Sequence, residues 1–270
     1  MLVFLSDIRF ASSARRLRRS RWRRIASSSG QCVIESDSQR HQARSLKGRR
    51  PRRVTQALFF DLDGTLIDSV PDIHTTANRV MAELGFAPLA RAEVQAFVGK
   101  GLPNLVARLL ERHGQDPAGA LHAPTTARFE AEYLTAHSLT TVYPGVLTAL
   151  NQLAARGAAL GVCTNKPLAP ARAVMDHLGL TPFFPTILGG DSLALRKPHP
   201  DHLHATARAL GRSQSVFVGD SEVDAETAHA AGVPFLLYTE GYRKSPLDQI
   251  VHSAAFDDWA NLPSLVTIWA

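Results

Sequence analysis

Residues 57–65, Ala-Leu-Phe-Phe-Asp-Leu-Asp-Gly-Thr, join an apolar run to two carboxylates and a turn. The run Ala57–Phe60 predicts a short, fully buried strand. Asp61 and Asp63 are two residues apart at the end of that strand, so both project toward the same region. Gly64 permits a tight turn with a close backbone approach. Taken alone, the stretch is more typical of an acidic turn or a calcium-binding loop, and the rest of the chain has to decide between these alternatives.

Strand-like apolar runs recur downstream, with helical patterns between them. The runs are Ala159–Cys163, Thr186–Leu188, Ser215–Val218 and Pro234–Tyr238. The helical patterns are Val146–Ala155, Ala169–Leu178, Pro200–Leu210 and Glu222–Ala231. Alternating strands and helices predict an α/β fold, a Rossmann-like, doubly wound parallel sheet that is covered on both faces. Gly232 follows the last of these helical patterns, where a left-handed residue commonly ends a helix.

Residues 71–140 separate the first two predicted strands and carry helical patterns of their own. The positions Leu102, Leu105, Val106, Leu109 and Leu110 form one apolar helix face. The block is too long for an ordinary crossover and contains no convincing strand. We therefore expect an all-helical cap domain over a core made of residues 56–70 and 141–270.

Residues 1–55 differ sharply in composition from the rest of the chain. They carry a net charge of +12, with Arg and Ser dominant, whereas residues 56–270 carry −6. Such a segment buries too little apolar surface to offset its ordering entropy, which predicts disorder. Three explanations stay open: an organellar targeting segment, a basic arm that binds polyanions, or a mis-assigned start, with the native chain beginning at Val54.

The overall composition narrows the class of protein further. The apolar runs are all far too short to span a membrane, which predicts a protein without a membrane partner. Cys32 and Cys163 lie in regions of very different character, which favours a reducing cytoplasm over a disulfide framework. Because the basic charge belongs to residues 1–55, no nucleic acid is expected as a partner of the core.

Polar side chains follow three further strand-like runs, at the edge of the sheet where ligands bind in open parallel folds. Thr164, Asn165 and Lys166 follow the second run, where a hydroxyl and free backbone N–H groups at a helix start suit a phosphate. Lys197 follows the third run, and Asp220 ends the fourth, four residues before Asp224. Lys166 either faces solvent, caps a neighbouring group or has a direct role. Cys163 is expected to pack inside a strand and not to act as a nucleophile.

These four motifs, in this order, resemble those of the haloacid-dehalogenase-like hydrolases. The details are most similar to the bacterial phosphoglycolate phosphatases, notably in residues 60–72, 97–101, 164–167 and 219–224. The resemblance implies a Mg²⁺-dependent phosphatase that hydrolyses 2-phosphoglycolate through an aspartyl-phosphate intermediate. It further implies a bacterial, cytoplasmic enzyme with a small phosphorylated carboxylic acid as substrate, acting as a monomer or homodimer.

The same resemblance implies a role for each motif residue. Asp61 is the nucleophile, and Asp63 is the acid that protonates the leaving group and then activates water. Mg²⁺ is held by the Asp61 and Asp220 carboxylates and the Asp63 backbone carbonyl, and Asp224 orients a metal-bound water. The balance of charge agrees with these roles. Two carboxylates and a phosphate dianion repel one another, so both the metal and Lys197 are needed to offset their negative charge.

Substrate binding is expected from Thr164, Asn165, Lys197 and a loop of the cap. Thr164 supplies an uncharged donor to the phosphoryl oxygens. In the loop Val98–Leu102, two glycines flank Lys100, which suits a flexible cation that meets the carboxylate of the leaving group when the cap closes.

Other functions are compatible with the same motifs. A phosphatase of this fold that acts on a sugar phosphate, a nucleotide or pyrophosphate shares all of them, and so does a mutase similar to β-phosphoglucomutase. A true dehalogenase is disfavoured, because that reaction needs no acid at Asp63. A binding module for polyanions that uses the basic residues 1–55 is the non-enzymatic alternative.

Overall fold

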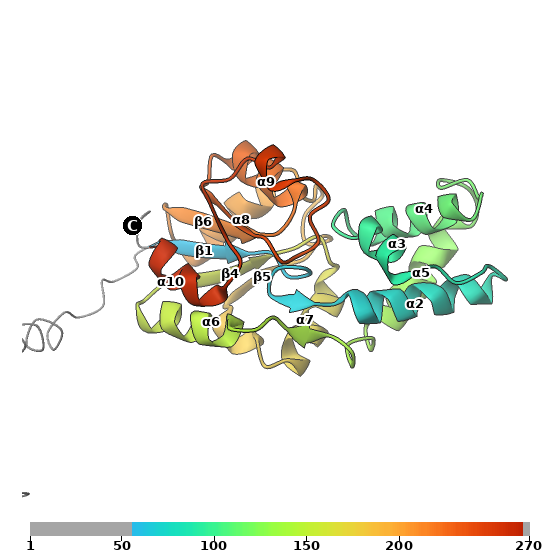
Figure 1. The fold of residues 1–270 in the computed structure, drawn as a ribbon, viewed down its shortest axis with the longest axis horizontal. Coiled ribbons are helices and arrows are strands. Elements are labelled where there is room, and N and C mark those ends of the chain that lie inside the picture. The colour runs from blue at the N-terminus through green and yellow to red at the C-terminus, as the bar shows by residue number, and fades with distance from the viewer. Residues whose placement is uncertain (1–55, 267–270) are drawn as a thin grey trace, which may run out of the picture. The chain divides into compact units, whose positions relative to one another are not determined.

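The structure is a computed structural model that describes residues 56–266. The predicted disorder of residues 1–55 lies outside the described residues. In the described part, the predicted α/β fold is confirmed as one six-stranded parallel sheet with helices on both faces (Figure 1). Within residues 56–266, no helix is long and apolar enough to cross a membrane.

The sheet has the strand order β5-β4-β1-β6-β7-β8. Its strands are β1 (Ala57–Phe60), β4 (Ala159–Cys163), β5 (Thr186–Leu188), β6 (Ser215–Gly219), β7 (Phe235–Tyr238) and β8 (Ala254–Phe256). Strand β1 is central, because it pairs with β4 on one side and β6 on the other. The chain moves outward from β1 in one direction through β4 and β5, and in the other through β6, β7 and β8. Ligands of open α/β sheets bind at such a reversal, beyond the carboxyl ends of the strands.

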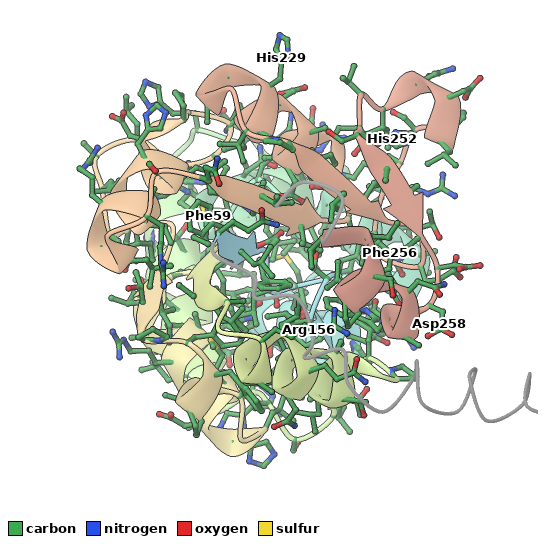
Figure 2. The ribbon with its side chains drawn as sticks, turned by 90° about the vertical axis from the view of Figure 1, so that its left-hand side faces the viewer. Phe59, Arg156, His229, His252, Phe256 and Asp258 are labelled. Atoms are coloured by element: carbon green, nitrogen blue, oxygen red, sulfur yellow. The ribbon has the colours of Figure 1, made fainter. Side chains whose placement is uncertain are left out.

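Successive residues of β1 enter two different apolar clusters, one on each face of the sheet. Leu58 and Phe60 pack with α6 (Val146–Ala155) and α7 (Leu168–His177). Phe59 packs on the other face with α8 (Asp201–Leu210) and α9 (Glu222–Ala231). In Figure 2, Arg156 at the end of α6 and His229 in α9 lie on opposite sides of the strands. A strand buried on both faces explains why residues 57–60 are continuously apolar.

Four helices form a helical insert between β1 and β4, and they have an apolar cluster of their own. The helices are α2 (Val70–Glu83), α3 (Arg91–Phe97), α4 (Leu102–Arg112) and α5 (His122–Tyr133). The apolar face of α4 that the sequence predicts is buried in this cluster, together with residues of α2 and α5. Figure 1 shows the insert beyond one end of the strands, on the right of the view. Its position matters because Tyr133 and the loop at Gly99 line the same pocket as Asp61.

The remaining elements are short. A two-stranded antiparallel ribbon, β2 (Ile67–Asp68) and β3 (Thr141–Val142), lies at the two chain crossings between sheet and insert. The helix α10 (Leu262–Leu265) and three 3-10 turns, Thr181–Phe183, Leu247–Gln249 and Trp259–Asn261, complete the described part. Strand β8 was not predicted from the sequence, because a three-residue strand has no apolar run that distinguishes it from a loop. Gly232 does end α9 in the left-handed conformation, as predicted, with φ 65°.

Candidate active site

Asp61 and Lys197 lie in contact just beyond the carboxyl end of strand β1. Strand β1 ends at Phe60, and the Asp61 backbone N–H donates to the Val218 carbonyl at 2.9 Å, which continues the ladder by one residue. The Lys197 Nζ lies 2.9 Å from Asp61 Oδ1 and 2.7 Å from Asp224 Oδ1. All three side chains are buried. The sequence placed these residues at one edge of the sheet, and the structure brings their charged atoms into contact.

Asp220 faces the same centre from the end of β6. Its carboxylate accepts from the Thr65 hydroxyl and from the Tyr242 backbone N–H, each at 2.6 Å. Gly64 is required here, because a Cβ at its φ of 87° would collide with the Asp220 carboxylate. Thr65 and Tyr242 are site residues that the sequence analysis missed. Thr65 belongs to the quoted motif and could have been included, whereas Tyr242 lies in a loop after β7 that has no apparent signal.

Asp61, Asp220 and Asp224 gather their carboxylate oxygens within 4.8 Å of one another. Burial raises the pKa of Asp61 to about 7, opposed by Lys197 and assisted by Asp224. Burial, together with the charges of Asp224 and Asp61, also raises the pKa of Asp220 well above its usual range. Three buried carboxylates against one ammonium leave an excess of negative charge. Such a centre favours an additional cation or bound protons.

The donors around each carboxylate indicate which ones are open to a cation. Asp224 is saturated, because it accepts from Lys197, from the Ser221 hydroxyl and from the backbone N–H groups of Asp220 and Ser221. Asp61 Oδ1 is buried and contacts the Lys197 Nζ at 2.9 Å, so the Asp61 carboxylate has fewer donors around it than that of Asp224. Asp61 and Asp220 are therefore better placed than Asp224 to coordinate a metal. Asp224 is better suited to orienting the Lys197 side chain than to orienting a metal-bound water.

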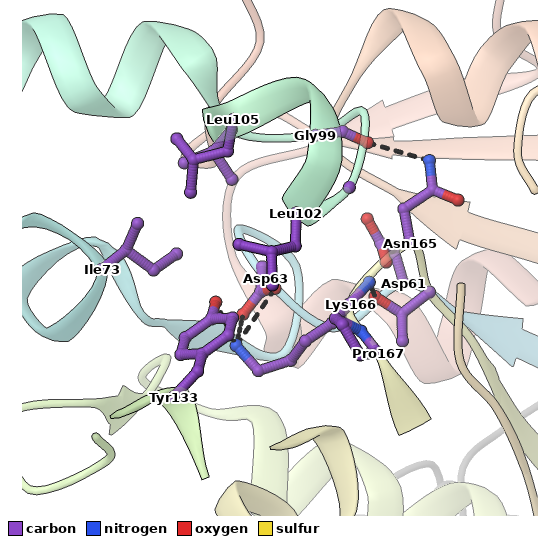
Figure 3. Close-up of a pocket in the computed structure, with 13 residues that line it drawn as sticks. Asp61, Asp63, Ile73, Gly99, Leu102, Leu105, Tyr133, Asn165, Lys166 and Pro167 are labelled. Carbon is purple, nitrogen blue, oxygen red and sulfur yellow. Dashed lines mark hydrogen bonds and ion pairs between the residues drawn. The ribbon is translucent and has the colours of Figure 1, made fainter. Parts of the chain in front are cut away.

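Asp63 lines the same pocket as Asp61 and has a separate lysine partner. Its carboxylate accepts from the Ser69 hydroxyl at 2.6 Å and from the Lys166 Nζ at 3.1 Å. Lys166 Nζ also contacts the Tyr133 hydroxyl, and Figure 3 shows it between Asp63 and Tyr133. Burial lowers the pKa of Lys166, and Asp63 opposes this shift.

The solvent-facing alternative for Lys166 is wrong, because the side chain is buried. No local pattern indicated this burial, because Lys166 lies in the bend after β4 ends at Cys163, where strand alternation no longer applies. Tyr133, at the end of α5, likewise gave no local signal.

Thr164 and Asn165 follow β4 as predicted, but the two side chains differ in whether they are free to bind a substrate. Both line the pocket that contains Asp61 and Asp63. The Asn165 amide donates to the carbonyls of Gly99 and Lys197, and its oxygen accepts from the Lys197 N–H, each at 3.0 Å. These bonds occupy both amide donors, so the Asn165 side chain joins the helical insert to the Lys197 loop. We infer a positioning role for it in place of direct substrate binding.

Lys100 lies apart from the pocket. The backbone around it lines the pocket at Val98, Gly99 and Gly101, but the Lys100 side chain is exposed and is not among the lining residues. Cys163 is fully buried in β4, and burial raises its pKa to about 12, which agrees with a packing role. Lys166 is therefore the basic side chain that lines the pocket, whereas the sequence analysis assigned Lys100 to the substrate.

The fold and this site define an α/β enzyme with carboxylates and lysines gathered beyond the central strand of a parallel sheet and a helical insert beside them. A model of the haloacid dehalogenase-like hydrolases matches residues 58–238. The chain belongs to the haloacid dehalogenase-like hydrolase family.

Curated relatives agree with this assignment. A protein named phosphoglycolate phosphatase from Rhodobacter capsulatus is 48% identical over 216 residues, which cover 80% of this chain and 99% of that protein. A protein of the same name from Rhodospirillum rubrum is 44% identical, covering 77% of this chain and 90% of its own length.

Solved structures support the fold. A crystal structure titled as a predicted phosphoglycolate phosphatase from Haemophilus somnus 129PT matches with a TM-score of 0.72 and 28% identity, covering 81% of this chain and 99% of that one. CbbY from Rhodobacter sphaeroides, solved in complex with phosphate, matches with a TM-score of 0.68 and 23% identity, covering 77% of this chain and 96% of that one. At that identity the second match supports the fold alone.

Proposed function

We propose that this enzyme hydrolyses 2-phosphoglycolate to glycolate and phosphate, with Asp61 as the nucleophile. The observation that carries the proposal is the pairing of two aspartates with two lysines, Asp61 with Lys197 and Asp63 with Lys166. The first pair suits attack on a phosphoryl group, and the second suits a proton transfer beside it. The names of the relatives supply the substrate, since the Rhodobacter capsulatus protein is 48% identical over nearly its whole length.

In this mechanism an Asp61 carboxylate oxygen attacks phosphorus, and the bond to the leaving-group oxygen breaks. Lys197 Nζ, 2.9 Å from Asp61 Oδ1, holds the carboxylate and offsets the negative charge of the approaching phosphate. The Thr164 hydroxyl, at the end of β4, supplies an uncharged donor to the phosphoryl oxygens. Asp224 keeps Lys197 in position through the 2.7 Å contact.

Asp63 transfers protons in both halves of the reaction. Its carboxyl group first gives a proton to the departing alkoxide oxygen of glycolate. The resulting carboxylate then takes a proton from the water that attacks the aspartyl-phosphate, which regenerates Asp61 and releases phosphate. Ser69 and Lys166 fix the orientation of this side chain through their bonds to Oδ1.

Mg²⁺ fits the residues of this centre, because the buried carboxylates of Asp61, Asp220 and Asp224 exceed the one ammonium group that contacts Asp61 and Asp224 in charge and have oxygens within 4.8 Å of one another. We propose the carboxylates of Asp61 and Asp220 and the backbone carbonyl of Asp63 as its protein ligands, a small set of hard oxygen donors typical of Mg²⁺. When bound, the metal would neutralise charge on the phosphoryl oxygens and the nucleophile.

A panel of phosphate esters tests the proposal. With Mg²⁺ present, we expect the highest kcat/KM on 2-phosphoglycolate, compared with glucose 6-phosphate, a nucleoside monophosphate and pyrophosphate. Conversion of β-glucose 1-phosphate to glucose 6-phosphate tests the mutase alternative in the same preparation. A clear preference for any other substrate, or mutase activity above hydrolysis, would overturn the assignment.

Asp61→Asn tests the nucleophile separately. Removing an obligatory nucleophile typically costs several orders of magnitude in kcat, so we expect only a trace of turnover with an unchanged circular dichroism spectrum. Asp257→Asn, at an exposed carboxylate, is the matched control and should behave as wild type. Substantial turnover by Asp61→Asn would rule out the aspartyl-phosphate route.

We further propose that the enzyme works in the bacterial cytoplasm on this small phosphorylated carboxylic acid. The bacterial origin of the relatives supports this location.

A further inference from the structure

The carboxylate of 2-phosphoglycolate needs a cationic partner close to the reaction centre, and this inference rests on the proposed function. Only two carbon atoms separate the leaving-group oxygen from the carboxylate oxygens of this substrate. The side chain that binds the carboxylate must therefore lie next to Asp63, which protonates that leaving-group oxygen. A partner on a distant loop does not meet this condition.

The pocket restricts the choice of partner. On the side of the helical insert, the lining side chains other than Tyr133 are apolar: Ile73, Val98, Leu102 and Leu105. Asp61 and Asp63 repel a carboxylate, and the Asn165 amide already donates to two backbone carbonyls. Among the lining residues, all in the described part of the chain, Lys166 is the only basic side chain and Tyr133 the only phenol.

Lys166 satisfies the distance condition. Its Nζ lies 3.1 Å from Asp63 Oδ1 and lies over the Tyr133 ring at 3.8 Å from the centroid. An ammonium group has three N–H donors that rotate together, so it can be shared between several acceptors. The Ser69 hydroxyl gives Asp63 a second donor, so Lys166 can turn toward a ligand without leaving that carboxylate unpartnered.

Tyr133 adds a hydroxyl from the helical insert. Burial and the nearby charges of Asp63 and Asp72 raise its pKa, so the phenol keeps its proton and can donate it to a carboxylate. Lys166 belongs to the sheet side of the pocket and Tyr133 to α5, and Figure 3 shows their side chains against each other. A ligand held by both side chains would also hold the insert in place over the centre.

We propose that Lys166 and Tyr133 form the subsite for the leaving-group carboxylate, and that they select 2-phosphoglycolate over phosphate esters of the same size whose leaving group is uncharged. This assignment replaces Lys100, whose side chain is exposed and outside the pocket lining.

A pair of non-hydrolysable inhibitors tests the subsite without requiring turnover. 3-Phosphonopropionate copies the chain length of the substrate with its carboxylate, and propylphosphonate has a methyl group in its place. Dissociation constants are measured for both by isothermal titration calorimetry with wild type, Lys166→Gln, Tyr133→Phe and the exposed control Lys100→Gln. Thermal unfolding of each variant checks that the fold is retained, and Tyr133→Phe keeps the buried ring.

Wild type should bind 3-phosphonopropionate more tightly than propylphosphonate. A hydrogen bond to a charged group corresponds to about 10- to 100-fold in affinity, so Lys166→Gln should reduce this preference by about that factor and Tyr133→Phe by about tenfold. Lys100→Gln should keep the wild-type preference. Loss of the preference in Lys100→Gln, or its retention in both pocket variants, would overturn the subsite.

The outcome for wild type separates this inference from the proposed function. If wild type shows no preference for the inhibitor with the carboxylate, and hydrolyses 2-hydroxyethyl phosphate as fast as 2-phosphoglycolate, the proposed substrate is wrong and the subsite falls with it. If wild type prefers the inhibitor with the carboxylate and Lys166→Gln weakens the binding of both inhibitors by the same factor, Lys166 only positions Asp63. In that case the substrate assignment stands and the subsite does not.

Discussion

Lys197→Met removes the only ammonium group that contacts the buried carboxylates Asp61 and Asp224 in the described part of the chain. Methionine is similar in length and fills the space, so the loss is chiefly one of charge. Both carboxylates then stay inside the protein without their cation. Burial alone lowers the pKa of Lys197, but the charges of Asp224 and Asp61 outweigh it and raise the pKa, so the lysine is charged at neutral pH.

The expected cost follows from that geometry. Removing one partner of a buried ion pair typically destabilises a protein by about 3–5 kcal/mol. For a domain of this size, each kcal/mol lowers Tm by about 2–4 °C, so we expect a decrease of about 6–20 °C at pH 8. The decrease should shrink as the pH falls to 5.5. In wild type, burial raises the pKa of Asp61 to about 7, above the value of 3.8 for an unperturbed Asp, and Lys197 opposes this shift. Without Lys197, Asp61 takes up its proton at a higher pH in the folded variant, so the variant gains more stability than wild type as the pH falls.

The assay is thermal unfolding by circular dichroism at pH 8 and pH 5.5, with EDTA present so that no divalent cation replaces the lost charge. Lys100→Met, at an exposed lysine, is the control and should change Tm by little at either pH. A decrease of the same size at both pH values, or none at pH 8, would refute the reasoning, because a packing defect does not depend on carboxylate protonation.

Two further predictions concern the metal and the insert. Mg²⁺ at about a hundredfold excess over its Kd should stabilise wild type by about 2.7 kcal/mol at pH 8, measured as a Tm increase. The increase should be smaller at pH 5.5, where protons on Asp61 and Asp220 compete with the metal; an equal increase would argue against these ligands. Asn165→Ala removes the bonds to Gly99 and Lys197 and should cost about 1–3 kcal/mol per unpaired group in unfolding free energy and raise KM. Asn165→Asp keeps an acceptor for the Lys197 N–H but no donors, so an unchanged KM in both variants would contradict the positioning role.

Much of the fold was predictable because its signals are local. The run Ala57–Phe60 is apolar since β1 is buried on both faces, and the predicted helices Val146–Ala155 and Glu222–Ala231 match α6 and α9 residue for residue. The convergence of Asp61, Thr164 and Asp220 was also predictable, because parallel strands all end at one edge of a sheet.

Other features depend on how distant segments pack and carry no local pattern. The three-residue strand β8 and the Tyr242 N–H bond to Asp220 both come from the chain after β7, where no apolar run or helical period identifies them. The burial of Lys166 likewise depends on α5, which lies more than thirty residues earlier in the chain and covers it with Tyr133.

The sequence by itself determined the class of fold and the chemical groups at the carboxyl edge of the sheet, because periodicity and strand ends are encoded by neighbouring residues. Only the tertiary structure decided which lysine serves which aspartate and which lysine enters the pocket. Lys197 reaches Asp61 and Asp224, Lys166 reaches Asp63, and Lys100 stays at the surface. The physical reason is that a lysine side chain is long and flexible, so its partner is set by where the packed insert and sheet place nearby carboxylates and not by its position along the chain.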